Sequence, residues 1–141
     1  MNKTAVIYWS GTGNTQAMAE AVLSGMKDAG ADALMLTPDQ VNASAIADLD
    51  GIALGCPAMG AEVLENSEFE PMYESIKPSL AGKAVALFGS YGWGDGEWMR
   101  SWEEDCSAAG IKLAAESVIC CEAPDDTALA ACRKLGAVLA K

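Results

Sequence analysis

Three uninterrupted apolar runs constrain the fold of this chain more than any other feature of its sequence. They cover residues 5–9, 51–56 and 84–89, and none of them alternates polar with apolar residues. Runs of this kind are typical of strands buried on both faces, as in a parallel sheet that helices cover on each side. The sequence predicts two weaker strands at residues 33–37 and around residues 113–119.

Hydrophobic residues recur at helical spacing between these runs, so amphipathic helices are expected to alternate with the strands. The predicted buried faces are Met18, Val22, Met26 and Ala29; Phe69, Met72, Tyr73 and Ile76; Trp98, Trp102 and Cys106; and Leu129, Cys132, Leu135 and Leu139. Gly30, Gly82 and Gly110 suit the ends of helices. A short further helix is predicted at residues 41–48.

The repeated strand–helix alternation predicts an α/β fold, a doubly wound three-layer sandwich whose five-stranded parallel sheet has helices on both faces. Right-handed crossovers favour the strand order 2-1-3-4-5. The length of 141 residues suits a single domain spanning residues 1–141. Ligands bind beyond the carboxyl ends of the strands in such sheets. The loops after the first, third and fourth strands are therefore the candidate site.

The charge balance excludes several classes of function. Lys and Arg number 9 and Asp and Glu number 20, which gives a formal net charge of −11. Nucleic acid and anionic membranes are therefore not expected as partners, whereas basic protein surfaces are. The sequence contains no histidine, which excludes Ser-His-Asp and Cys-His catalysis and any His-ligated metal site.

The five cysteines form no C-x-x-C motif, so we expect neither an iron–sulfur cluster nor a zinc ribbon, and no bound metal. Their odd number and the lack of a secretory signal indicate reduced thiols and a cytoplasmic location. The apolar runs are far too short to span a bilayer. For the adjacent Cys120 and Cys121, buried structural thiols are a better interpretation than a redox pair.

The first candidate loop is rich in glycine and in hydrogen-bond donors. It consists of Ser10, Gly11, Thr12, Gly13, Asn14 and Thr15 and leads into a helix. Backbone N–H groups that converge at a helix N-terminus bind anions, and hydroxyl groups add donors. The Lys of a P-loop and the third glycine of a dinucleotide fingerprint are both missing. The loop therefore suits a terminal phosphate monoester. The alternative is a capped turn that binds nothing.

The second candidate loop contains Pro57, Ala58, Met59, Gly60 and Glu62. Gly60 tolerates the positive φ of a type II turn, so the Met59–Gly60 peptide could flip and exchange a carbonyl for an N–H. The Glu62 carboxylate could accept a hydrogen bond from the N–H of a heterocycle. The alternative is an ordinary surface turn.

The third candidate loop contains Ser90, Tyr91, Gly92, Trp93 and Gly94. Glycines around the indole favour an exposed Trp93, which suits stacking on an aromatic ligand. The alternative is packing of Trp93 against its own domain, the role expected of Trp98, which lies one helical turn before Trp102. A phosphate monoester at the first loop and a planar ring at the other two describe a mononucleotide-like cofactor, and FMN fits best.

Three segments carry a resemblance to a known family. They are YWSGTGNT at residues 8–15, LGCPAMGAEVLENSEFEP at residues 54–71 and VALFGSYGWGDGEWMR at residues 85–100. Together they resemble the short-chain flavodoxins, in particular the clostridial type, and the resemblance covers essentially the whole chain. It implies a flavodoxin-like fold and non-covalent binding of FMN.

The resemblance also implies roles for individual residues. Residues 10–15 would bind the FMN phosphate, while Met59 and Trp93 would cover the inner and outer faces of the flavin. Glu62 would accept a hydrogen bond from the flavin N3–H. The peptide between Met59 and Gly60 would flip toward the flavin N5 on reduction.

The ribityl chain and the pyrimidine edge of the flavin would be lined by Ala58, Ser90 and Gly92. Some relatives have Ser where this chain has Pro57. A hydroxyl contact to the phosphate or the ribityl chain would then be missing here.

The function implied by the resemblance is that of a low-potential one-electron carrier between redox enzymes, cycling mainly between semiquinone and hydroquinone without substrate turnover of its own. Acids in the adjacent segments would lower the potential; they are Glu62, Glu65, Glu68, Asp95 and Glu97. The partners would be redox proteins with basic docking faces, and the carrier would be a monomer. The alternative is an FMN-dependent quinone or nitro reductase, for which the chain offers few residues to form a lid.

Overall fold

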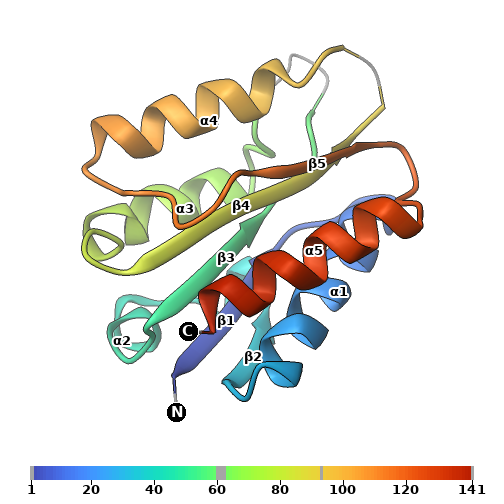
Figure 1. Ribbon diagram of the computed structural model, residues 1–141. Coiled ribbons are helices and arrows are strands. Elements are labelled where there is room, and N and C mark those ends of the chain that lie inside the picture. Colours follow the sequence, from blue (N-terminus) through green and yellow to red (C-terminus); the bar gives the residue numbers. More distant parts are fainter. Residues whose placement is uncertain (1, 60–62, 93, 141) are drawn as a thin grey trace.

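The computed structural model describes residues 2–59, 63–92 and 94–140, and a parallel five-stranded sheet forms its middle layer (Figure 1). The strands are β1 (Lys3–Tyr8), β2 (Asp32–Leu36), β3 (Gly51–Gly55), β4 (Ala84–Tyr91) and β5 (Val118–Cys121). Their order across the sheet is β2-β1-β3-β4-β5, and the neighbouring strands are parallel. The predicted doubly wound fold and its strand order are confirmed.

Helices cover both faces of this sheet (Figure 1). They are α1 (Asn14–Asp28), α2 (Ala43–Ala47), α3 (Phe69–Ile76), α4 (Glu97–Ala108) and α5 (Asp126–Leu139), with the single 3-10 turns η1 (Pro38–Gln40) and η2 (Lys77–Ser79). Helices α1 and α5 lie on one face, and α2, α3 and α4 lie on the other. The predicted three-layer sandwich is therefore confirmed. Within the described residues, no helix combines the length and the apolar character needed to cross a membrane.

Helices α1 and α5 approach each other through two glycines. A Cβ atom on Gly25 would lie 1.9 Å from the backbone oxygen of Arg133, and one on Gly136 would lie 2.1 Å from that of Val22. These distances leave no room for a side chain at either glycine. Apolar side chains of the two helices complete this layer; they include Met18, Met26, Cys132, Leu135 and Leu139.

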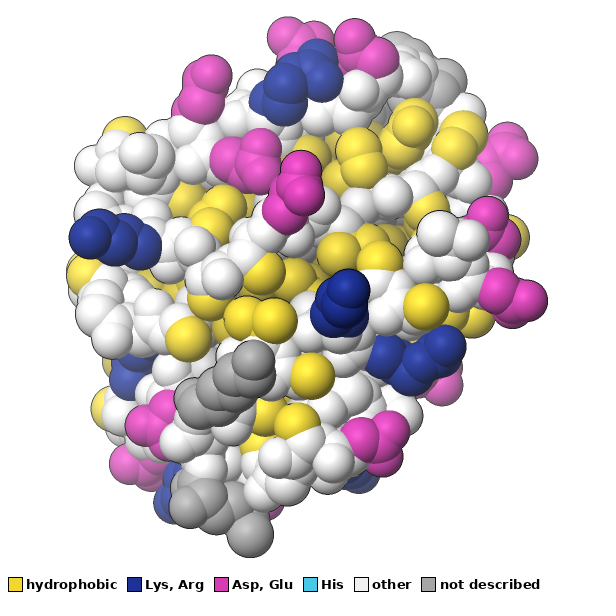
Figure 2. All heavy atoms as spheres, viewed as in Figure 1, with side chains coloured by type: hydrophobic (Ala, Val, Ile, Leu, Met, Phe, Trp, Pro, Cys, Tyr) yellow, Lys and Arg dark blue, Asp and Glu magenta, His cyan; other side chains and the backbone are white. Residues whose placement is uncertain are grey.

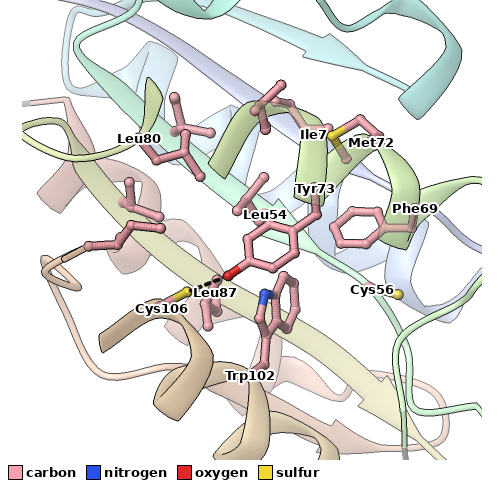
Figure 3. Packing of buried hydrophobic residues seen from close by; sticks show 14 of the residues in the cluster. Ile7, Leu54, Cys56, Phe69, Met72, Tyr73, Leu80, Leu87, Trp102 and Cys106 are labelled. Atoms are coloured by element: carbon pink, nitrogen blue, oxygen red, sulfur yellow. Dashed lines mark hydrogen bonds between the residues drawn. The ribbon is translucent and has the colours of Figure 1, made fainter. Parts of the chain in front are cut away.

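Aromatic side chains join α3 to α4 on the opposite face. The ring of Trp102 packs edge-to-face against Phe69 and Tyr73, with centroid distances of 5.5 and 6.0 Å. Figure 3 shows these rings together with Leu54 and Cys106 in the apolar interior above the sheet. Edge-to-face pairs add directional attraction to the burial of apolar area, so this cluster holds α4 against α3.

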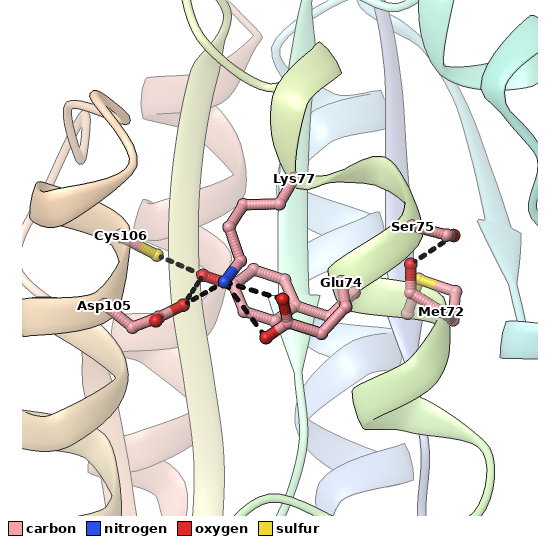
Figure 4. Close-up of polar contacts among 7 residues, drawn as sticks. Met72, Glu74, Ser75, Lys77, Asp105 and Cys106 are labelled. Carbon is pink, nitrogen blue, oxygen red and sulfur yellow. Dashed lines mark hydrogen bonds and ion pairs between the residues drawn. The ribbon is translucent and has the colours of Figure 1, made fainter.

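A polar cluster closes the outer side of the same interface (Figure 4). The Lys77 ammonium group lies 2.9 Å from a carboxylate oxygen of Glu74 and 2.9 Å from one of Asp105. The Tyr73 hydroxyl donates a hydrogen bond of 2.8 Å to Asp105, and Cys106 Sγ lies 3.3 Å from the same hydroxyl. Burial and these two neighbours raise the pKa of Tyr73, so the hydroxyl remains a donor at physiological pH.

The fifth strand departs from its predicted bounds. Leu113 forms an isolated bridge to Val85, but continuous pairing with β4 begins only at Val118, opposite Phe88. Four residues on the edge therefore lie between the two pairing points, against two on β4. The Ala114 N–H still donates to the Val85 carbonyl over 2.7 Å, and the segment 115–117 leaves the sheet. An edge strand has a partner on only one side, so such an excursion breaks few ladder hydrogen bonds.

The bounds of β1, β2 and α2 differ from the predicted ones by one or two residues, and two further differences concern β4 and α1. Strand β4 extends through Tyr91, so Ser90 and Tyr91 belong to the strand rather than to the loop after it. Ala29 was expected on the buried face of α1 but caps the helix and is exposed. The chain turns at Gly30, whose φ of 91° is the left-handed conformation that ends the helix.

Candidate functional site

A cleft of about 450 Å³ opens at the carboxyl edge of the sheet. Its lining residues come from the ends of β1, β3, β4 and β5 and the loops that follow; they are Trp9, Gly11, Thr12, Asn14, Pro57, Ala58, Met59, Ser90, Tyr91, Gly92 and Glu122. The volume lies in the range of small-molecule sites in proteins. The structure thus brings residues of all three sequence-predicted loops to one cleft.

The loop after β1 contributes Gly11, Thr12 and Asn14 to the lining of this cleft, whereas Ser10, Gly13 and Thr15 are not among the lining residues. Gly13 has φ 96°, and its N–H donates to Ser10 Oγ over 3.1 Å just before α1 begins. Thr15 is 1% exposed, and its hydroxyl has no hydrogen-bond partner among the described residues. A buried hydroxyl without a partner costs free energy unless a ligand or water completes its bonding. The first turn of α1 therefore fits an anion such as a phosphate group.

The segment after β3 is held against β4 by the backbone. The Ala58 N–H donates to the Ser90 carbonyl over 3.0 Å, which continues the pairing of β3 with β4 beyond the end of β3. The Met59 N–H donates to the Val63 carbonyl over 2.9 Å and joins the two flanks of the loop. Pro57, Ala58 and Met59 line the cleft. Gly60 and Glu62, which the sequence analysis singled out, lie outside the described residues.

Trp98 supports both of the loops that follow β3 and β4. It is 1% exposed, its indole Nε1 donates to the Cys56 carbonyl over 3.1 Å, and its ring lies 5.5 Å from that of Tyr91. The prediction of a structural role for Trp98 is confirmed. Gly92 and Gly94 are exposed after β4, and Trp93 between them lies outside the described residues.

Two cleft residues were missed by the sequence analysis. Trp9 is half-buried, and its Nε1 donates to the Glu68 carboxylate over 2.8 Å. Its position at the end of the first apolar run, next to the glycine-rich loop, could have revealed it. Glu122 follows β5 at the same edge of the sheet. Its φ of 58° is unusual for a residue with a side chain, and nothing in the sequence indicates that conformation.

One acid near the cleft, Glu65, is buried and has a structural role. Glu65 was named among the acids that would lower the potential of the flavin, and the structure shows that it is 4% exposed. Burial opposes its ionisation, yet hydrogen bonds from Ser67 and from the N–H groups of Phe69, Ser67 and Glu68 outweigh it and lower its pKa to about 2. This carboxylate therefore stabilises the start of α3. No Lys or Arg is present among the described residues that line the cleft.

The cysteines also differ in their surroundings. Cys56, Cys106 and Cys132 are buried, and burial raises the pKa of Cys56 and Cys132 to about 12. Cys120 is half-buried with its sulfur 3.6 Å from Met18 Sδ, whereas Cys121 is exposed. The expectation of two buried structural thiols is therefore wrong for Cys121. Adjacent residues of an edge strand point to opposite sides, which places only one of them against α1.

Fold and cleft together define a doubly wound α/β protein that binds a mononucleotide. The crevice lies at the carboxyl ends of the strands, where the winding of such sheets reverses. Its phosphate-compatible end is the first turn of α1, and half-buried aromatic side chains (Trp9 and Tyr91) line the remainder. The residues present fit FMN, which has a terminal phosphate and a flat ring.

Comparison with known proteins agrees with this class. The family model described as flavodoxin matches residues 6–136. A flavodoxin of Megasphaera elsdenii is 44% identical over 136 residues, covering 96% of this chain and 97% of the relative. One of Clostridium beijerinckii is 47% identical over 121 residues, covering 86% and 88%. The solution structure of the two-electron reduced Megasphaera protein superposes with a TM-score of 0.89 over 97% of this chain and 98% of the other.

The chain belongs to the flavodoxin family. Flavodoxins bind FMN and transfer electrons between redox proteins, and this chain is accordingly an FMN-binding electron carrier.

Proposed function

We propose that the cleft at the carboxyl edge holds FMN with its phosphate at residues 10–15 and its ring between the loops of Met59 and Trp93. The observation that supports this most directly is the convergence of the three predicted loops on one cleft. FMN supplies the redox chemistry, since it accepts and releases electrons one at a time or in pairs. The chain binds it, orients it and sets the electrostatic surroundings.

The phosphate end relies on neutral donors. Residues 10–15 offer backbone N–H groups and the hydroxyls of Ser10, Thr12 and Thr15. The unpartnered Thr15 hydroxyl supports a direct hydrogen bond to the phosphate. Because no Lys or Arg is found among the described residues that line the cleft, affinity comes from converging donors and from the helix dipole.

The ring end combines apolar cover with two polar contacts. Met59 and Trp93 would cover the two faces of the flavin, and Ala58 and Gly92 would lie at its edge. Glu62 would accept a hydrogen bond from the ring N3–H. Glycine at position 60 would let the Met59–Gly60 peptide present its carbonyl to a protonated ring nitrogen N5.

The surroundings of the cleft favour a low potential. Taking up an electron makes the ring more negative, and the described lining offers no basic side chain to offset this. Exposed carboxylates nearby, such as Glu97 and Glu122, oppose the added charge. By Coulomb's law with solvent screening, each of these carboxylates lowers the reduction potential by an amount on the order of tens of millivolts.

The acids also guide docking. With a formal net charge of −11, the chain attracts redox proteins that have basic faces, and it repels acidic ones. We infer that the carrier works as a monomeric single domain of residues 1–141 in the cytoplasm, forms short-lived complexes and turns over no substrate of its own.

An anaerobic reductive titration followed across the visible spectrum tests the carrier function. We expect a yellow protein with two well-separated one-electron midpoint potentials, the second of them low. A yellow protein that takes both electrons in a single step and oxidises NAD(P)H steadily would instead be a quinone or nitro reductase. A colourless chain that does not bind added FMN would overturn the proposed site.

Electron transfer to a small basic haem protein tests the docking. Its second-order rate should fall as sodium chloride increases, and Glu97→Gln should weaken this salt dependence. Glu104→Gln is the matched control, because Glu104 is exposed on the same helix seven residues farther from the cleft. Equal salt dependences for the two variants would contradict docking at the cleft edge.

A further inference from the structure

We propose that Ser90 is a positioning residue. It holds the turn after β5 in a strained conformation, and in that conformation the turn lines the cofactor cleft together with the loops after β1, β3 and β4. The proposal rests on the proposed FMN site. It assigns Ser90 a target in the protein rather than in the cofactor, and it adds Glu122 to the site.

The hydrogen bonds at this turn are short and mutually supporting. The Ser90 hydroxyl, on a residue that is 4% exposed, donates to the Glu122 carbonyl over 2.7 Å. The Glu122 N–H in turn donates to the Tyr91 carbonyl over 2.7 Å. Two adjacent residues of β4 therefore clamp both backbone polar groups of one residue beyond β5.

The clamped residue has a conformation that it would not adopt readily by itself. Glu122 has φ 58°, and among the described residues it is the one non-glycine residue with a positive φ. The left-handed region disfavours residues with a Cβ, and Asn tolerates it several times more often than Glu does. Such strain persists only where the surroundings hold it in place.

The position of the turn shows what the clamp accomplishes. Glu122 lines the cleft together with Ser90, Tyr91 and residues of the loops after β1 and β3. A free turn would have to be ordered each time the cofactor bound, which lowers affinity. With the Ser90 hydrogen bond in place, the turn at Glu122 is already ordered before the cofactor binds.

A weaker donor near the same carbonyl provides a control. Cys120 Sγ lies 3.6 Å from the Glu122 oxygen, and a thiol is a poor donor compared with a hydroxyl. Cys120→Ala should therefore change the FMN dissociation constant less than twofold, whereas Ser90→Ala should raise it about five- to tenfold.

The decisive experiment measures how residue 122 changes the effect of Ser90→Ala. FMN dissociation constants are determined for Ser90→Ala in chains with Glu, Gln, Asn or Gly at position 122. Gln and Asn remove the same charge, but only Asn suits the left-handed conformation. We expect the five- to tenfold loss with Glu and with Gln, and less than about twofold with Asn and with Gly.

Hydrogen exchange provides a readout that does not involve FMN. In the FMN-free full-length chain, the Glu122 amide should exchange about five- to tenfold faster after Ser90→Ala, and at nearly the original rate after Cys120→Ala. Ser90→Cys, which keeps a weak donor, replaces Ser90→Ala if the latter does not fold, and it should give a smaller increase.

Opposite results would overturn the proposal. The same loss of affinity in all four chains would mean that Ser90 acts on the cofactor directly, and unchanged amide exchange would mean that the turn is not clamped. Failure of the unaltered chain to bind FMN would instead count against the proposed function, because the exchange experiment still tests the clamp.

Discussion

Several polar residues of this protein make hydrogen bonds that could not be predicted from their residue type. Glutamate is usually found on the surface, yet Glu65 is buried and accepts hydrogen bonds from Ser67, Glu68 and Phe69 at the start of α3. Those bonds satisfy N–H groups that would otherwise lack partners near a helix N-terminus. Glu65 therefore belongs to the scaffold beneath the cleft.

Glu65→Gln should lower the free energy of unfolding by about 2 kcal/mol at pH 7, because hydrogen bonds to a charged acceptor become bonds to a neutral one. Folding lowers the pKa of Glu65 from 4.5 to about 2, so the unfolded chain takes up a proton first as pH falls. The stabilisation is complete above about pH 5 and disappears toward pH 2. Urea unfolding at several pH values should therefore show the difference from wild type shrinking below pH 5, whereas Glu104→Gln should show almost none.

Trp93→Ala and Trp98→Ala should have different effects, the first on cofactor binding and the second on stability. Trp93→Ala should raise the FMN dissociation constant with little change in the unfolding of the FMN-free chain, since its proposed role is to cover the flavin. Trp98→Ala should lower the free energy of unfolding by about 3–5 kcal/mol, as expected for a fully buried tryptophan. Fluorescence titration with FMN and chemical unfolding measure the two effects. Unchanged FMN affinity in Trp93→Ala would contradict stacking.

At the level of elements, close helix packing and edge-strand geometry decide how the cleft is built. Helices α1 and α5 meet where Gly25 and Gly136 each face a backbone carbonyl of the other helix. This contact brings α1, whose first turn forms the proposed phosphate site, into a fixed position on the sheet. Strand β5 then carries the chain from α4 to the cleft, after an excursion at residues 115–117 that an edge strand tolerates.

Gly136→Ala should destabilise the protein even though alanine favours helices by about 1 kcal/mol over glycine. Its Cβ would lie 2.1 Å from the Val22 carbonyl oxygen, so the two helices must separate. We expect a net loss of about 1–3 kcal/mol, typical of overpacking, in chemical unfolding. Ser24→Ala, at an exposed position of α1, is the control and should be neutral or slightly stabilising. A Gly136→Ala protein as stable as wild type would disprove the close contact.

The whole molecule is dominated by its negative charge. Figure 2, seen from the side of β5 and α5, shows apolar side chains across the middle of the face. Acidic side chains lie both at its edge and nearer its middle, with several Lys or Arg side chains among them. Twenty acidic residues against nine basic ones leave the formal net charge at −11. Repulsion of this kind opposes the compact state and also orients the molecule toward basic partners.

Raising sodium chloride from about 0.01 to 0.3 M should therefore stabilise the FMN-free chain, because the Debye length falls from about 30 Å to below 10 Å. We expect Tm to rise by several degrees in a thermal scan. Chloride is used because sulfate stabilises folded proteins by exclusion as well. Glu104→Lys, which reduces the net charge by two, should show a smaller rise than Glu104→Asp. A Tm independent of salt would refute the repulsion.

The sequence by itself determined the fold and the place of the site. Non-alternating apolar runs such as residues 51–55 require burial on both faces, and the chain can satisfy that only as a parallel sheet between helices. Because the carboxyl ends of those strands meet at one edge, the glycine-rich loop at residues 10–15 and the loops after β3 and β4 had to meet there too.

Only the tertiary structure decided which polar groups serve the scaffold and which line the cleft. Glu65 is buried, Ser90 lies within β4 and donates to Glu122, and Glu122 adopts a left-handed backbone. Each of these depends on hydrogen bonds between segments far apart in the chain, and local residue preferences carry no record of such bonds. Glutamate disfavours the left-handed conformation, and it is held there by two residues of a neighbouring strand.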